Sequence, residues 1–377
     1  MMKSISIWKQ ELTGGTHAAR LASLYCCKPE ETPAQAARYT AVLDGLEATF
    51  GPHAEAGLYS APGRTEIGGN HTDHQHGRVL AGSVNIDMIA AAAPNSLNQL
   101  RVQSEGYDLC VIDLADLAAR KEEENTTISL LRGACEAFRQ RGAALSGLDV
   151  YVASNVPKGS GVSSSAAFEV LIGVILNDCF MTEKVSPIEI AQIGQWAENV
   201  YFGKPCGLMD QAAVCLGGLA YMDFEDQAQP KTQKLELNFE DHGYALVLVK
   251  VGADHVAATD DYAAVPREMQ DVAAEFGKER LCEGDVADFD AKLPELRAKL
   301  GDRACLRAVH YWYENGLVDK RWAALNAGDI DQFLVLTRES GASSAMYLQN
   351  VVAKLGSEQP SMYALALAEH VLDGRGA

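Results

Sequence analysis

The chain has 377 residues, of which 47% are apolar and 22% charged, so it can bury a sizeable core in two domains and is neither disordered nor fibrous. Its 51 acidic and 32 basic side chains give a formal net charge of -19, and no Lys/Arg cluster interrupts this balance, which argues against nucleic acid as a partner. Any nucleotide site must therefore depend on local groups such as backbone amides, a helix terminus and a metal ion.

The start of the chain and the cysteines predict a cytoplasmic location. Residues 1–13 lack the apolar stretch of a signal peptide, and nowhere do about 18 apolar residues follow one another. The nine cysteines form no regular framework and are expected to be reduced thiols. We therefore expect no membrane partner. For the assembly, we expect a monomer or a weak homodimer.

The first half of the chain mixes strand and helix patterns. Strand-type runs are expected at Leu58–Ser60, Val79–Ala93, Leu100–Ser104, Leu148–Ala153 and Gly218–Phe224. Helical spacing is found near Ile128–Arg141, at Ser165–Cys179 and from Ser186-Pro187 through Glu198. These elements place three polar clusters at the ends of strands and helices.

The first polar cluster, residues 61–77, lies between two strand-type runs and contains Arg64, Asn70, Asp73 and three histidines. A ligand rich in hydroxyl groups needs such a mixture of hydrogen-bond donors and acceptors. A metal site built from the histidines and Asp73, as in a metal-dependent hydrolase, is a second interpretation. A polar loop with solvated histidines is a third.

The second cluster, residues 155–169, turns the chain between a strand-type run and an apolar helix. Gly159 and Gly161 permit positive φ and a close approach of the backbone, and the helix adds its positive N-terminal end. Ser163, Ser164 and Ser165 add hydroxyl groups. The pattern favours a phosphate site, although it lacks the Gly-Lys-Ser/Thr end of a Walker A loop. An ordinary strand–turn–helix joint with serine N-caps is the alternative.

The third cluster, residues 198–211, ends in Asp210, just beyond a glycine-containing turn and before an apolar run. A carboxylate in this position is a candidate general base. Taken alone, it is equally typical of a helix N-cap.

A polar segment at residues 226–241 marks the predicted domain boundary, which gives domains of residues 1–235 and 236–377. A strand-type run at Tyr244–Val251 follows it. Helical patterns then occupy Pro266–Phe276, Leu293–Leu300, Asp302–Asn315, Ile330–Ser340 and Pro360–Leu372. The expected fold class is α+β, with most helices in the second half.

The three clusters together resemble the GHMP family of small-molecule kinases, named for galactokinase, homoserine kinase, mevalonate kinase and phosphomevalonate kinase. Residues 63–77 resemble the galactokinase signature Gly-Arg-Val-Asn-Leu-Ile-Gly-Glu-His-Thr-Asp-Tyr. Residues 157–166 resemble the phosphate loop of the family, and residues 205–211 resemble the stretch that holds its catalytic aspartate. The similarity extends from about residue 58 to the end of the chain and is greatest to the galactokinases.

The resemblance implies a two-domain GHMP kinase fold, with an N-terminal domain of the type shared with a ribosomal protein and an active site in the cleft between the domains. It implies ATP as co-substrate, Mg²⁺ as cofactor and a sugar, most of all galactose, as the acceptor at its anomeric hydroxyl. Asp210 would be the base, and Arg64 would stabilise the transferring phosphoryl group. Ser165 and Glu198 would hold the metal ion. The phosphate-binding set would be Lys158, Gly159, Ser160, Gly161, Val162, Ser163, Ser164 and Ser165, and the sugar-binding set Asn70, His71, Asp73, Gly207 and Tyr262.

Two departures from the family pattern bear on this expectation. Asn70 and His74 stand where the signature has Glu and Tyr, so an amide replaces a carboxylate, and N-acetylgalactosamine, arabinose or another small alcohol is an alternative substrate. The chain also ends at Ala377 without the glycine-rich third motif that closes over the active site of galactokinases, so it is either a fragment or an enzyme without this wall. The helical run Pro360–Leu372 favours a fragment, which we expect to be poorly active. A catalytically silent sugar sensor is a further alternative, which the joint presence of Arg64, Ser165, Glu198 and Asp210 disfavours.

Overall fold

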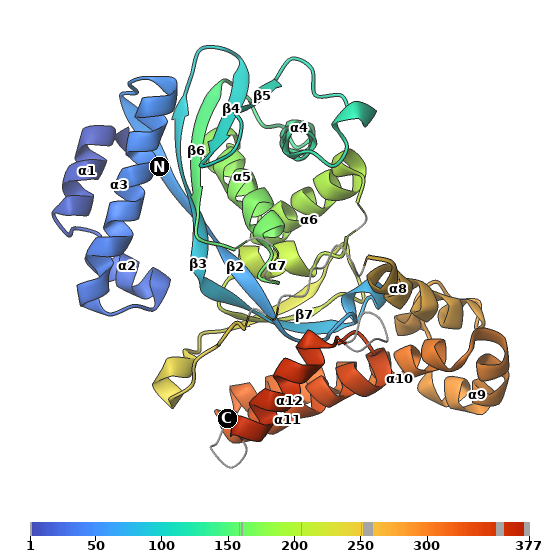
Figure 1. Cartoon of the computed structure of the whole chain (residues 1–377). Helices are drawn as coiled ribbons and strands as arrows, with labels where there is room; N and C mark the ends of the chain where they lie inside the picture. The colour runs from blue at the N-terminus through green and yellow to red at the C-terminus, as the bar shows by residue number, and fades with distance from the viewer. Residues whose placement is uncertain are drawn as a thin grey trace. The chain divides into compact units, whose positions relative to one another are not determined.

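The computed structural model describes residues 2–157, 159, 161–204, 206–249, 251, 259–351 and 358–372. It divides into two compact units, each drawn in Figure 1. The first consists of Met1–Thr65 and Ser83–Gly217, and the second of Glu66–Gly82 and Gly218–Ala377. These units divide the chain at positions other than the expected boundary after residue 235, which stays a prediction.

The first unit is built on a mixed β-sheet. Its strand order is β1 (Lys3–Ser4), β2 (Glu55–Gly68), β3 (Arg78–Pro94), β6 (Leu148–Ser154), β4 (Gln99–Ser104) and β5 (Cys110–Asp113). β3 and β6 are antiparallel, with register from Met88↔Ser154 to Pro94↔Leu148. β4 and β6 are parallel, which requires a long connection, and α4 (Thr127–Gln140) provides it.

Helices cover both faces of this sheet, as Figure 1 shows for the first unit. Successive side chains of a strand point to opposite faces, so β3 serves two cores. Met88, Ala90 and Ala92 pack in the core with α4, α5 (Ser164–Phe180), α6 (Pro187–Ala197) and α7 (Met209–Leu216). Ile89, Ala91 and Ala93 pack in the core with α1 (Ile5–Thr13), α2 (Ala18–Tyr25) and α3 (Thr32–Phe50). The small alanines allow helices to approach the sheet closely on both sides.

The second unit combines the beginning of β3 with two more strands and a set of helices. β7 (Leu219–Asp223) pairs antiparallel with β3 from Arg78↔Asp223 to Gly82↔Leu219, and on its other edge with β8 (Lys231–Leu235). The helices are α8 (Thr259–Ala274), α9 (Val286–Leu300), α10 (Asp302–Asn326), α11 (Ile330–Ser343) and α12 (Pro360–Leu372). One core lies among α8, α9 and α10, and another joins α10 and α11 to β7.

Most expected elements are present, and the α+β class is confirmed. The expected strand at Tyr244–Val251 is wrong over residues 244–249, which form no strand, while residue 250 lies outside the described residues. The side chains of Leu246, Val247, Leu248 and Val249 are 57% to 74% exposed. A strand-type sequence forms a strand only when a neighbouring strand satisfies its backbone groups, and none pairs with residues 244–249 within the described ranges.

Two further expectations concern the whole chain. All nine cysteines are free thiols, as predicted. None of the helices in the described ranges combines the length and the apolar composition needed to cross a membrane.

Candidate active site

Three of the described residues between β6 and α5 have positive φ values. Gly159 and Gly161 have φ values of +64° and +80°, and Ser163, the N-cap of α5, has φ of +52°. The side chain of Ser163 does not cap the helix. The first N–H groups of any α-helix lack intrahelical acceptors and carry partial positive charge, so the first turn of α5, with Ser164 and Ser165, can receive an anion. Of the predicted phosphate-binding set, Lys158 and Ser160 lie outside the described residues.

Strand β2 lies directly against this loop. The N–H of Arg64 donates to the carbonyl of Val162 at 3.1 Å. A Cβ on the preceding residue, Gly63, would lie 3.0 Å from the same carbonyl oxygen, so a glycine allows this close approach. The Arg64 guanidinium also donates through Nη1 to the carbonyl of Gly161 at 2.6 Å. Arg64 is thereby fixed at the edge of the loop.

Asp210, in the first turn of α7, meets both Arg64 and the loop. Arg64 Nε lies 2.8 Å and Nη2 2.6 Å from Asp210 Oδ1. The hydroxyl of Ser163 donates to Asp210 Oδ2. The Asp210 side chain is 32% exposed and that of Arg64 is 12% exposed. The structure thus brings an oriented carboxylate, a guanidinium and a helix N-terminus together within the first unit.

A cluster of two carboxyl groups and one amide lies next to Asp210 in the first unit. It consists of Glu169, Glu198 and Gln211, and Glu198 opens the π-helical segment Glu198–Phe202. The amide nitrogen of Gln211 donates to Glu169 Oε2 at 2.9 Å and to Glu198 Oε2 at 3.1 Å. Glu169 is 6%, Glu198 5% and Gln211 1% exposed. Glu169 Oε1 and Gln211 Oε1 are buried and have no partner. The cluster therefore contains two buried oxygen atoms that no protein group among the described residues engages.

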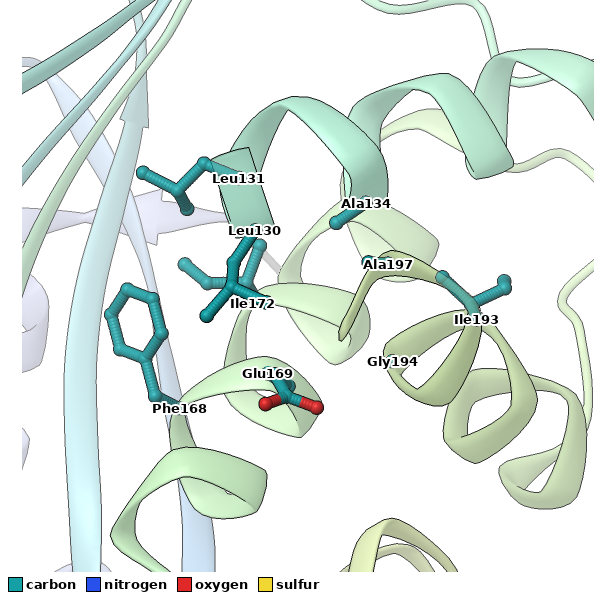
Figure 2. A pocket seen from close by; sticks show the side chains of 9 residues that line it. All are labelled: Leu130, Leu131, Ala134, Phe168, Glu169, Ile172, Ile193, Gly194 and Ala197. Atoms are coloured by element: carbon teal, nitrogen blue, oxygen red, sulfur yellow. The ribbon is translucent and has the colours of Figure 1, made fainter. Parts of the chain in front are cut away.

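Burial, followed by the negative charge of Glu198, raises the pKa of Glu169 to about 8. Figure 2 shows its carboxyl group beside an apolar cavity between α4, α5 and α6, lined by Leu130, Leu131, Ala134, Phe168, Ile172, Ile193, Gly194 and Ala197. The cavity measures about 10 Å³, which is at the lower limit for a single water molecule. Apolar surroundings of this kind disfavour the charged form, so burial favours the protonated form of Glu169.

The donor set of the first unit fits Mg²⁺. Magnesium prefers oxygen ligands and is usually held by one or two carboxylates while keeping waters and substrate phosphates. Glu198 supplies a buried carboxylate, Ser165 lies in the first turn of α5, and the unpartnered oxygens of Glu169 and Gln211 are available to bound water.

The interpretation of the signature histidines as a metal site is wrong. In the described part of the chain, no group of three or more His, Cys, Asp or Glu side chains is arranged to hold a metal ion. His71, Asp73, His74 and His76 all belong to that part. His71 and His74 instead stack on each other, with ring centroids 5.5 Å apart.

The predicted sugar-binding residues other than Gly207 group in the second unit. The ring of Tyr262, on α8, lies 5.0 Å from His71 and 6.3 Å from His74, centroid to centroid. Burial lowers the pKa of His71 to about 3, so its ring is neutral. Asn70 follows β2, and Asp73 begins the turn Asp73–Gln75. Gly207 belongs to the first unit, in the turn before α7.

Sequence reasoning missed several polar residues that contact these groups. Glu169 follows Ser165 by four residues on α5, and this helical spacing was a usable signal. Gln211 lies next to Asp210. His310 and Ser344, which contact Asn70, lie about 240 and 274 residues away in sequence, and no local pattern connects them to it.

Comparisons with known proteins agree with these features. The model of the GHMP kinases N terminal domain matches residues 129–218, and the galactokinase galactose-binding signature matches residues 46–94. A galactokinase of Streptomyces coelicolor is 32% identical over 280 residues, which is 72% of this chain and 70% of the relative. A galactokinase of Bacillus subtilis is 30% identical over 308 residues, 80% of this chain and 77% of the relative.

Solved structures show the same fold. The crystal structure of Lactococcus lactis galactokinase complexed with galactose has a TM-score of 0.68 at 24% identity, covering 83% of this chain and 80% of that one. Methanococcus jannaschii mevalonate kinase has a TM-score of 0.52 at 13% identity, with 80% and 81% covered.

Proposed function

The chain belongs to the galactokinase group of the GHMP kinases, and we propose on this premise that it transfers the γ-phosphoryl group of ATP to the anomeric hydroxyl of galactose. The product would be galactose 1-phosphate. The observation that carries the proposal is the contact of Asp210 with Arg64 and Ser163 at the N-terminus of α5. Phosphoryl transfer depends mainly on positioning and charge neutralisation, and these groups are suited to both.

In this mechanism the phosphates of ATP bind to the N–H groups of the loop and of the first turn of α5. Arg64 is held by Gly161 and Asp210 at the edge of that loop, so its positive charge stabilises negative charge on the transferring group. Asp210 accepts the proton of the attacking sugar hydroxyl, because it is partly exposed and is oriented by the donors Arg64 and Ser163. Ser165 and Glu198 would hold Mg²⁺, which supplies further charge neutralisation on the phosphates.

We propose that Asn70, His71, Asp73, Gly207 and Tyr262 bind the sugar. Four of them lie close together in one unit, and they offer an amide, a neutral imidazole, a carboxylate and a phenol. Each of these groups forms hydrogen bonds with hydroxyls of a neutral sugar. The free thiols of the chain support a cytoplasmic location. A monomer or weak homodimer stays our proposal for the assembly.

The test is an ATP-consumption assay with galactose, N-acetylgalactosamine, glucose, arabinose, mevalonate and homoserine, with the product identified by phosphorus NMR. We expect turnover with galactose above all. Asp210→Asn and Arg64→Lys should each lower kcat by roughly 100-fold or more with an unchanged melting temperature, since general-base and electrostatic groups typically contribute that much.

The matched control is Asp108→Asn, because Asp108 is an exposed aspartate of the same unit, and we expect it to retain full activity. Wild-type rates in the Asp210 or Arg64 variant would remove that residue's role. Binding of galactose without any turnover would show a sugar sensor instead of an enzyme.

A further inference from the structure

Helix α10 holds the backbone at the end of β2 and the start of the signature loop. Arg321 Nη1 donates to the carbonyl of Ile67 at 2.7 Å, and the N–H of Gly69 donates to Glu314 Oε1 at 3.0 Å. His310 Nε2 lies 2.9 Å from the carbonyl oxygen of Asn70. The three α10 side chains are 0% exposed. Their helical spacing places them on one face of α10, so this face fixes successive backbone groups leading to Asn70.

The protonation of His310 follows from its partners. The carbonyl of Asn70 can only accept, so His310 Nε2 carries the hydrogen. Burial lowers the pKa of His310 and so favours the neutral ring, in which Nδ1 is the acceptor. Ser343 Oγ, 2.8 Å from Nδ1, therefore donates to it. Ser343 thus donates to His310, and His310 donates to the carbonyl of Asn70.

The side chain of Asn70 is held as firmly as its backbone. Its Nδ2 donates to Ser344 Oγ at 3.0 Å, and Ser344 opens the π-helical segment Ser344–Leu348. Ser344 is 8% exposed, so this contact is largely protected from water. Because the amide group is planar, turning Nδ2 toward Ser344 leaves Oδ1 directed away from it. With Nδ2 engaged by Ser344, Oδ1 is the atom through which Asn70 can accept a hydrogen bond from a ligand.

We propose that Ser344 and His310 are positioning residues that set the sugar specificity by holding Asn70 with its amide oxygen toward one hydroxyl of the sugar. The inference rests on the proposed function, because it takes the ligand beside Asn70 to be the sugar. An amide held in this way acts as an acceptor. The Asn70–Ser344 contact thus presents an acceptor to a sugar hydroxyl that donates, as the carboxylate of the family signature would. Replacing that carboxylate by the amide of Asn70 therefore does not by itself change the substrate.

The first experiment compares Ser344→Ala with Ser344→Thr and the wild type. We expect Ser344→Ala to raise KM for galactose about 3- to 10-fold, the range for loss of one neutral hydrogen bond, with kcat changed by less than about twofold. Ser344→Thr keeps the hydroxyl and should restore KM. In calorimetry without ATP, the dissociation constant of galactose should rise by the same factor. Melting temperatures of the variants exclude a general loss of folding.

A double-mutant cycle with Asn70→Ala identifies the route of the effect. If Ser344 acts through Asn70, Ser344→Ala should have no further effect on KM in the Asn70→Ala background. The same logic applies to galactose analogues that each lack one hydroxyl group. Ser344→Ala should weaken binding of every analogue except the one whose missing hydroxyl is the partner of Asn70.

The outcomes separate the inference from the proposed function. Galactose binding that is unchanged in Ser344→Ala, or an equal penalty for all analogues, overturns the inference while leaving galactose phosphorylation in place. Binding of galactose to the wild type without phosphorylation overturns the proposed function, and the calorimetric comparison still decides the role of Ser344. A wild type that neither binds nor phosphorylates galactose overturns both.

Discussion

Replacement of Glu169 by Gln tests whether burial raises the pKa of this carboxyl group beside the candidate active site. The change removes the titrating group and keeps its size, and the new side-chain oxygen can still accept from Gln211 Nε2. In the wild type, burial and the charge of Glu198 raise the pKa of Glu169 from 4.5 to about 8. We expect Glu169→Gln to be more stable than the wild type at neutral pH, and the advantage to depend on pH.

The sign and size follow from proton linkage. Between pH 4.5 and about 8 the folded protein holds one proton at Glu169 that the unfolded chain has lost. The free energy of unfolding of the wild type therefore falls as the pH rises. The contribution of the Glu169 proton to stability is complete below the pKa of the unfolded chain, 4.5, and is lost by the time the pH passes the pKa of the folded protein, about 8. From pH 5 to pH 7 the difference is 2 pH units at 1.36 kcal/mol each, so the advantage of Glu169→Gln should grow by about 3 kcal/mol.

The measurement is urea unfolding at several pH values in the absence of divalent metal ions, followed through far-UV circular dichroism and tryptophan fluorescence, to which Trp196, packed against the same core, contributes. Glu30→Gln, at an exposed glutamate of the same unit, is the control and should show no such growth. If the advantage of Glu169→Gln is the same at pH 5 and pH 7, the fold does not hold Glu169 protonated, and our reading of the cluster is wrong.

Two other predictions concern the ion pair of the second unit. Arg321 and Glu314 are both 0% exposed and 2.6 Å apart, so Arg321→Met should lower the free energy of unfolding by about 3 to 5 kcal/mol in urea titrations, because it leaves a buried carboxylate without its cation. Adding Glu314→Leu should recover much of this loss, and a double variant no more stable than the single one would contradict the explanation. A Cβ on Gly68 would lie 1.9 Å from Arg321 Nη2, so Gly68→Ala should cost roughly 1 to 3 kcal/mol and lower the melting temperature. Gly316→Ala, where no atom beyond the local backbone of α10 lies within 4 Å of the added Cβ, is the matched control and should be neutral or slightly stabilising.

Apolar patterns predicted the elements that build the core of the first unit. β3, α4 and α5 were all expected close to their observed bounds, because each carries a run of apolar residues that the core buries, on both faces in the case of β3. In the second half, two helices begin earlier than expected, ahead of an internal proline. α8 begins at Thr259 and α9 at Val286, both before the prolines Pro266 and Pro294 that lie inside them. Packing in the core compensates for the hydrogen bond that each proline removes, which a pattern does not reveal.

The site was predicted in part. The motifs identified Arg64 and Asp210, and the structure adds the contacts that orient them. The direction of the Asn70 amide was beyond sequence reasoning, because it is set by Ser344, 274 residues further along the chain. The link between Glu169 and Glu198 through Gln211 depends on three separate helical elements, so it also required coordinates.

The way in which β2 and β3 pass through both units limits how the chain can be dissected. The backbone crosses from one unit to the other at three places, after residues 65, 82 and 217. A fragment beginning at Gly218 would lack residues 78–82, the strand partners of β7, and would expose one edge of β7. Separate production of the second unit therefore requires residues 66–82 to be joined to it by a new connection, and a single cut after residue 217 yields two incomplete pieces.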